Sequence, residues 1–199
     1  MSSAPRSDEP DRWEALFADL SAELDAAAAA DLTAEVADRV RRERGQLRLV
    51  DRFRAAVDRL VRIQVRGAGT VVGRVAEVGP DFLLVREEFG RRTVLPLVAV
   101  LSVTGLGAGT SPPLPANSLD ARLDLRHALR RLVRDRAAVS VTLLDGSVLT
   151  GTLDQVGADF VELAQHGADE PRRRAAVRSV ATVALRAVAA VRSQLPPEG

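Results

Sequence analysis

The densest group of side chains able to bind a charged ligand is a run of arginines near the end of the chain. Arg172, Arg173 and Arg174 are consecutive, and Arg178 follows them. Guanidinium groups donate paired hydrogen bonds to phosphates and carboxylates, so this loop is a candidate contact for nucleic acid or an acidic protein partner. A solvated loop is the alternative interpretation, because all 28 basic residues are arginines and coding bias explains that richness equally well.

Side chains that could carry out catalysis are few. The chain has no cysteine, which excludes disulfides, thiolate metal sites and cysteine nucleophiles. His127 and His166 have no partner at a spacing typical of a metal site or a general base. Without lysine there is no phosphate-binding loop ending in GK[ST], and the sequence contains no G-x-S-x-G motif. We therefore expect a protein that is not an enzyme and that holds no metal and no cofactor.

Two aspartate–phenylalanine pairs occupy similar turns. Asp81 precedes Phe82, and Asp159 precedes Phe160, each shortly after a glycine. A short acidic side chain at such a position accepts backbone N–H bonds and fixes the turn. We expect both phenylalanines to lie at equivalent positions of the hydrophobic core rather than to stack on bases.

An amphipathic helix is predicted near the N-terminus. Large apolar residues follow the spacing of three and four that is typical of one helix face: Trp13, Leu16, Phe17, Leu20 and Leu24. Burying each such side chain is worth roughly 1.5–3 kcal/mol, so the face is too large to leave in water. We expect it to dock on the chain's own barrels, on another copy of the chain or on a protein partner.

Charge is distributed unevenly along the chain. Residues 1–40 contain ten acidic residues against three arginines, whereas the remainder contains 17 acidic residues against 25 arginines. An acidic arm therefore precedes a mildly basic body. The first residues do not resemble a secretory signal, and no apolar run approaches the roughly 20 residues needed to span a bilayer. We expect a cytoplasmic protein without membrane contact.

The body contains two similar segments. Val61–Val85 aligns without a gap on Val139–Leu163 at an offset of 78 residues, and both alternate apolar and polar residues as half-buried strands do. The later stretches Arg91–Val103 and Val180–Val191 match at an offset of 88, which indicates a ten-residue insertion. Self-similarity at a fixed spacing predicts a repeated supersecondary unit.

The second segment carries a motif that resembles Sm-like proteins: L-T-G-T-L-D-Q-V-G-A-D-F-V-E-L, from Leu149 to Leu163. Gly151 and Gly73 are similar to the family's mid-strand glycine, which lets the second strand bend round a small barrel. Val94-Leu95-Pro96-Leu97 is similar to the family's fourth strand and the turn after it. The resemblance implies a helix followed by a five-stranded small barrel, a shape that SH3-like barrels share.

The residues of the family's RNA pocket are not matched. Sm-like proteins have an asparagine in the turn between strands two and three, where this chain has Gly157-Ala158-Asp159. The family's basic residue–glycine pair near strand five is also missing. The resemblance therefore implies the fold and not the pocket. The whole chain also resembles a group of actinobacterial proteins, a resemblance that implies no mechanism.

The sequence thus predicts an α+β fold, with an N-terminal helical arm followed by two repeated helix-plus-five-strand small β-barrels of the Sm-like or SH3-like type. The helices before the barrels are expected at about Leu47–Leu60 and Ser118–Ala137. The expected organisation is 1–10 disordered, 11–45 the helical arm, 46–104 a helix plus the first barrel, 105–117 a linker, 118–194 a helix plus the second barrel, and 195–199 a tail.

Two functions are compatible with this sequence. The first is a non-catalytic interaction or regulatory module, built on the tandem barrels, that binds a protein partner or associates with itself through the N-terminal helix. A homo-oligomer is expected in that case, and a dimer is favoured. The alternative is a nucleic-acid-binding protein, with RNA as the ligand, that uses the basic loops of the barrels.

Overall fold

The computed structural model describes residues 17–21, 23, 32, 35, 38–39, 41, 45–112, 123–166 and 179–193. The chain divides into two units, Met1–Leu47 and Arg48–Gly199. In the first unit every described residue from Phe17 to Gly45 is helical, as the apolar spacing predicts. The segments expected to be disordered or to form a tail, 1–10 and 195–199, lie outside the described residues.

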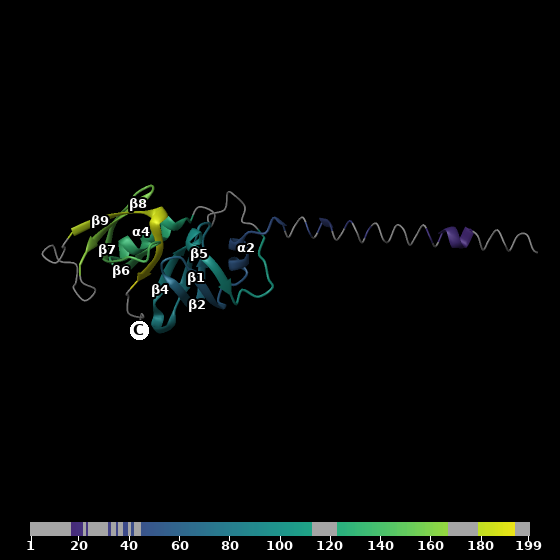
Figure 1. Ribbon diagram of the computed structural model, residues 1–199, viewed down its shortest axis with the longest axis horizontal. Helices are drawn as coiled ribbons and strands as arrows, with labels where there is room; N and C mark the ends of the chain where they lie inside the picture. Colours follow the sequence, from purple (N-terminus) through teal and green to yellow (C-terminus); the bar gives the residue numbers. More distant parts are fainter. Residues whose placement is uncertain are drawn as a thin grey trace, which may run out of the picture. The chain divides into compact units, whose positions relative to one another are not determined.

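The second unit is built mainly from strands (Figure 1). Among the described residues its helical segments are α2 (Leu49–Arg54), α4 (Leu125–Asp135) and three short 3-10 turns, η1 (Glu88–Gly90), η2 (Leu97–Ala99) and η3 (Leu185–Ala187). Its strands are β1 (Leu60–Val65), β2 (Gly69–Val78), β3 (Phe82–Arg86), β4 (Arg92–Pro96), β5 (Val100–Thr104), β6 (Ala138–Leu143), β7 (Val148–Val156), β8 (Phe160–Gln165), β9 (Ser179–Ala184) and β10 (Val188–Ser193). We call β1–β5 the first strand set and β6–β10 the second strand set.

All ten strands form one sheet in the order β5-β1-β2-β3-β4-β10-β6-β7-β8-β9, and every neighbouring pair is antiparallel. The prediction of two repeated Sm-like or SH3-like barrels is therefore wrong. The sheet is continuous and open, with β5 and β9 at its two edges. Figure 1 shows the C-terminal strand, drawn in yellow, passing between β4 and β6.

The physical reason for this correction is the pairing of β4 with β10. Val94 lies opposite Val191 and Thr93 opposite Arg192, so the fourth strand of the first set bonds across the boundary to the last strand of the second. Alternating apolar residues predict a strand and its buried face, but they do not say which neighbour supplies the hydrogen bonds at an edge. The sequence pattern was therefore compatible with both arrangements.

The hydrophobic cores confirm that the two strand sets form one body. The core of the first set includes Ala189 and Ala190, which belong to β10. The core of the second set includes Phe82 and Val94, which belong to β3 and β4. Each set therefore supplies buried side chains to the other, and the boundary between them is itself part of the apolar interior.

The helix before the first strand set is shorter than predicted. The expected helix Leu47–Leu60 is a six-residue helix, α2, because the chain turns to meet β2. Asp58 adopts a left-handed conformation with φ of 63°, and its N–H donates to the carbonyl oxygen of Val75 at 2.8 Å. Val57 forms a parallel bridge with Val75. Backbone pairing with a strand has replaced the last helical turn.

The helix before the second strand set starts with two carboxylates. Asp124 is the N-cap residue of α4, and its side chain accepts the N–H of His127 at 3.0 Å. Asp81, from the turn between β2 and β3, accepts the N–H of Leu125 at 2.7 Å. These bonds satisfy two of the four N–H groups that a helix start leaves without intrahelical partners.

Although the two sets are not separate barrels, local features correspond between them. The N–H of Leu97 donates to the carbonyl of Asp81 at 2.8 Å, and the N–H of Leu185 donates to the carbonyl of Asp159 at the same distance. The pairs β2–β3 and β7–β8 also have register shifts at corresponding places. A Cβ added to Gly151 would lie 2.0 Å from a carbonyl oxygen of β8, so a glycine is required where the strands approach closely.

Among the described residues, no helix is long and apolar enough to cross a membrane.

Candidate interaction surfaces

Of the apolar helix face predicted in the arm, Phe17 and Leu20 are described. Both are helical, and their side chains are 65% and 46% exposed. A spacing of three residues places them on the same side of a helix. Leu32, further along, is exposed as well. Trp13, Leu16 and Leu24 lie outside the described residues.

The basic loop cannot be placed, because Arg172, Arg173, Arg174 and Arg178 all lie outside the described residues. A different arginine-rich surface is described on the first strand set. It is a shallow pocket of about 740 Å³ lined by Leu60, Thr70, Val72, Gly73, Arg74, Arg86, Glu87, Glu88, Phe89 and Arg91.

The most exposed feature of this pocket is Phe89. Its side chain is 80% exposed, and its backbone has a φ of 60°, which a bulky residue seldom adopts. The exposed Arg86 and Arg91 lie on either side of it in sequence. An aromatic ring held outward beside guanidinium groups can stack on a flat ligand whose charge is negative.

The acidic residues of this pocket are partly neutralised. Glu87 accepts a hydrogen bond from the Nε of Arg192 at 3.2 Å, and the hydroxyl of Thr93 donates to the same carboxylate. Arg74 donates to the backbone carbonyl of Asp58 at 2.7 Å. With Glu87 engaged, the arginines dominate the charge available to a ligand.

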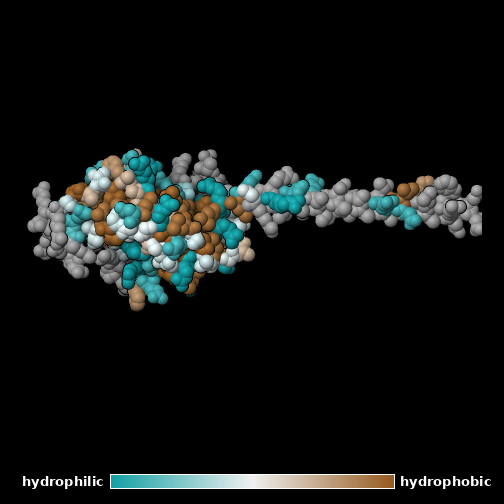
Figure 2. All heavy atoms as spheres, viewed as in Figure 1, coloured by the Kyte–Doolittle hydropathy of each residue, from teal (hydrophilic) through white to brown (hydrophobic). Residues whose placement is uncertain are grey.

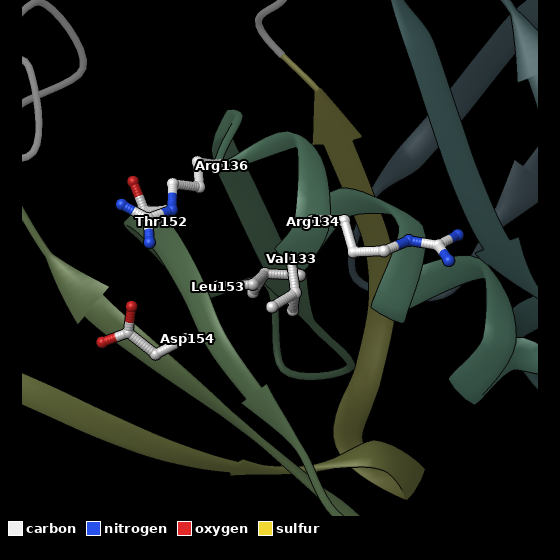
Figure 3. Close-up of a pocket in the computed structure, with 6 residues that line it drawn as sticks. All are labelled: Val133, Arg134, Arg136, Thr152, Leu153 and Asp154. Atoms are coloured by element: carbon white, nitrogen blue, oxygen red, sulfur yellow. The ribbon is translucent and has the colours of Figure 1, made fainter.

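A second pocket, of about 510 Å³, lies between the end of α4 and β7. Figure 3 shows Val133 of α4 beside Leu153 of β7, Arg134 directed away from them, and Arg136 and Asp154 on the opposite side.

Below this pocket the structure brings together two residues that sequence reasoning did not connect. The hydroxyl of Thr152 and the Nε2 of His166 are 2.8 Å apart, and both side chains are buried. Their strands pair so that Thr152 lies opposite Ala164, two residues before the histidine. Because neither group reaches solvent, the pair is suited to holding the end of β8 in place rather than to acting on a substrate.

The turn aspartates differ in their roles. Burial raises the pKa of Asp81 above its ordinary value, an effect that the hydrogen bond from Leu125 opposes. At the same helix start, the pKa of Asp124 lies below its ordinary value: burial acts to raise it, but bonds from Arg126 and His127 together outweigh that effect. Asp159, the counterpart of Asp81, is exposed. Asp81 therefore accepts a backbone N–H as expected, but this N–H belongs to the start of α4 and lies outside the turn.

We expected Phe82 and Phe160 to lie at equivalent positions of the core, and this prediction is wrong for Phe160. Phe82 is fully buried in the core of the second set, whereas Phe160 is only half-buried. Phe82 is covered by α4, which follows the first strand set in the chain. No described element follows the second strand set to cover Phe160 in the same way. Gly79 lies against the ring of Phe82 and the backbone of Leu123.

Within the described ranges, no cluster of three or more histidine and acidic side chains could hold a metal ion.

Comparison with protein-family models and with curated proteins gave no match for this chain. The resemblance to Sm-like proteins stays a prediction. Phe89 was missed at the sequence level, because a lone phenylalanine between glutamate and glycine gives no signal of its exposure.

Proposed function

We propose that the protein is a non-catalytic, cytoplasmic interaction module that associates with a second copy of itself through its N-terminal helix. The observation that carries this proposal is the exposure of Phe17 and Leu20 on one side of that helix. Removing these two side chains from water would contribute roughly 2–3 kcal/mol per helix. Two such helices, each acidic overall, can bury their apolar faces against one another while their charged faces stay in solvent.

The test is sedimentation of the full chain and of a variant carrying Phe17→Ser and Leu20→Ser. If the helix mediates association, both copies lose this contribution, and the dissociation constant should rise by roughly 1,000- to 10,000-fold, because each 1.4 kcal/mol is a factor of ten. The matched control is Asp19→Ser, which alters an exposed residue on the opposite side of the same helix. Equal masses for the full chain and the double variant at every concentration would refute self-association through this face.

Nucleic-acid binding, with single-stranded RNA as the ligand, is a second candidate function. The specific observation that favours it is the exposed ring of Phe89 beside Arg86 and Arg91. A base stacked on an aromatic side chain contributes about 1–3 kcal/mol, so Phe89→Ala should weaken binding of an RNA oligonucleotide by roughly 5- to 150-fold. Val98→Ala, which changes another exposed apolar residue, is the matched control.

Salt dependence separates the two arginine groups that could contact phosphates. Arg91→Ala should reduce the slope of log affinity against log salt by about one. Replacing Arg172, Arg173 and Arg174 together with alanine should reduce it by roughly two to three if the basic loop also contacts RNA. If the chain binds no RNA even at low salt, nucleic-acid binding is refuted as its function.

A further inference from the structure

Three arginines lie in one row across neighbouring strands of the first strand set. Arg74 of β2 is directly opposite Arg86 of β3, and Arg86 is directly opposite Arg92 of β4. Directly opposite residues of antiparallel strands point to the same face of a sheet, and neighbouring strands are about 4.8 Å apart. All three side chains are exposed, and none forms an ion pair with a residue that the structure describes. We call Arg74, Arg86 and Arg92 the arginine row.

The arginine row is unfavourable in a chain without a ligand. Like charges directly opposite one another in a sheet are destabilising. Arg74 donates to the backbone carbonyl of Asp58 at 2.7 Å, which holds its guanidinium group in place without neutralising it. A negatively charged ligand would remove the repulsion, so the arginine row points to an anionic partner.

Apolar side chains lie next to the arginine row. Leu60 of β1 is directly opposite Arg74, and its side chain is 60% exposed. Leu60 and the exposed Val72 both line the pocket around Phe89. In Figure 2, apolar residues drawn in brown reach the surface over β1 and β2, next to hydrophilic residues drawn in teal. An apolar strip beside a basic strip suits an amphipathic helix with acidic residues better than it suits a small anion.

The N-terminal helix presents side chains of the complementary kinds. Phe17, Leu20 and Glu23 are helical and exposed, and their spacing of three places them along the same side of the helix. Residues 1–40 contain ten acidic residues against three arginines. Two such helices packed against each other would bring like charges together, whereas the arginine row offers the opposite charge.

We propose that the N-terminal helix of one copy docks in the pocket around Phe89 of a second copy. Phe17 and Leu20 pack on the apolar strip, and Glu23 pairs with Arg86 at the centre of the arginine row. This inference rests on the proposed self-association and names the surface that the helix binds. Each copy has one helix and one pocket, so the docking is reciprocal and gives a dimer with two-fold symmetry and two identical contacts.

Reversing single charges in the full chain tests this pairing. Arg86→Glu and Glu23→Arg should each raise the dissociation constant of the dimer by roughly 10- to 100-fold, because each brings like charges together at both contacts. Combined in one chain, the two changes should recover most of that loss. Arg86→Glu places a carboxylate between Arg74 and Arg92, so the sheet should stay folded, which circular dichroism checks. The control is Arg186→Glu, at an exposed arginine of the second strand set.

Mixing two defective variants separates docking in the pocket from packing of helix on helix. Phe17→Ser with Leu20→Ser removes the helix face, and Arg86→Glu removes the pocket. An equimolar mixture retains one intact contact, between the helix of the second variant and the pocket of the first. Sedimentation should therefore show a dimer at concentrations at which neither variant associates alone. Added salt should weaken the unmodified dimer, because it screens opposite charges, whereas it would strengthen the packing of two acidic helices.

The proposal is overturned if Arg86→Glu associates as the unmodified chain does while the changes at Phe17 and Leu20 abolish association, a result that leaves the proposed function intact. A mixture that stays monomeric, or a dimer that salt strengthens, overturns it as well. A full chain that is monomeric at every concentration refutes self-association itself and this docking with it. If Arg86→Glu loses RNA binding without any change in association, the arginine row belongs to nucleic acid instead.

Discussion

The burial of Phe82 gives the sharpest test of the arrangement of the two strand sets. Its side chain belongs to the first set by sequence but is fully buried in the core of the second. Phe82→Ala should therefore cost about 3–5 kcal/mol of unfolding free energy, the usual range for a buried phenylalanine. For a unit of this size that corresponds to a fall in melting temperature of roughly 10 °C.

Phe160→Ala is the matched comparison, because Phe160 occupies the corresponding position without the covering helix. A half-buried ring should lose roughly half as much, about 1.5–2.5 kcal/mol. Urea titrations followed by circular dichroism measure both values.

Two results would refute this reasoning. A cost for Phe82→Ala below about 1 kcal/mol would mean that the ring is exposed and that α4 does not cover it. Equal costs at both positions would mean that the two sets are covered alike, which contradicts the shared core.

Three further changes test other features. Gly151→Ala should destabilise the chain by several kcal/mol in urea titration, because the new Cβ would lie 2.0 Å from a backbone oxygen; an unchanged midpoint would show that the strands can separate there. His166→Ala should cost about 1–3 kcal/mol by leaving the buried hydroxyl of Thr152 unsatisfied, and the double change with Thr152→Val should cost less than the two single costs combined. Burial raises the folded-state pKa of Asp81 above 3.8, so its ionisation lowers stability as pH rises through that interval. The stability of Asp81→Asn relative to the unmodified chain should therefore increase with pH, whereas Asp81→Ala should cost about 1 kcal/mol by freeing the N–H of Leu125; a difference for Asp81→Asn that is independent of pH would refute the pKa assignment.

The elements of the fold were largely predictable, whereas their connection was not. The strand from Val61 and the offset of 88 residues both follow from local patterns of apolar residues. The pairing of β4 with β10 across the two sets depends on edge hydrogen bonds and on a few shared apolar contacts. Two closed barrels would bury the same residues in the same alternation, so periodicity alone could not separate the alternatives.

The candidate surfaces were predictable only where they depend on helical spacing. Phe17 and Leu20 could be assigned from their position in an amphipathic pattern. Phe89 could not, because its exposure results from a left-handed backbone in a tight turn.

The place of β10 in the sheet also governs how the chain can fold as it is synthesised. The last strand of the described chain lies between β4 and β6, so β4 has no partner on that side until residues 188–193 have been made. The first strand set can pair early, but its apolar edge, with Val94, must wait while almost a hundred further residues are added. Closing that gap joins residues distant in sequence, which makes it a slow step. Loss of the final strand would remove the centre of the sheet rather than its end, leaving two half-sheets, each with an uncovered edge.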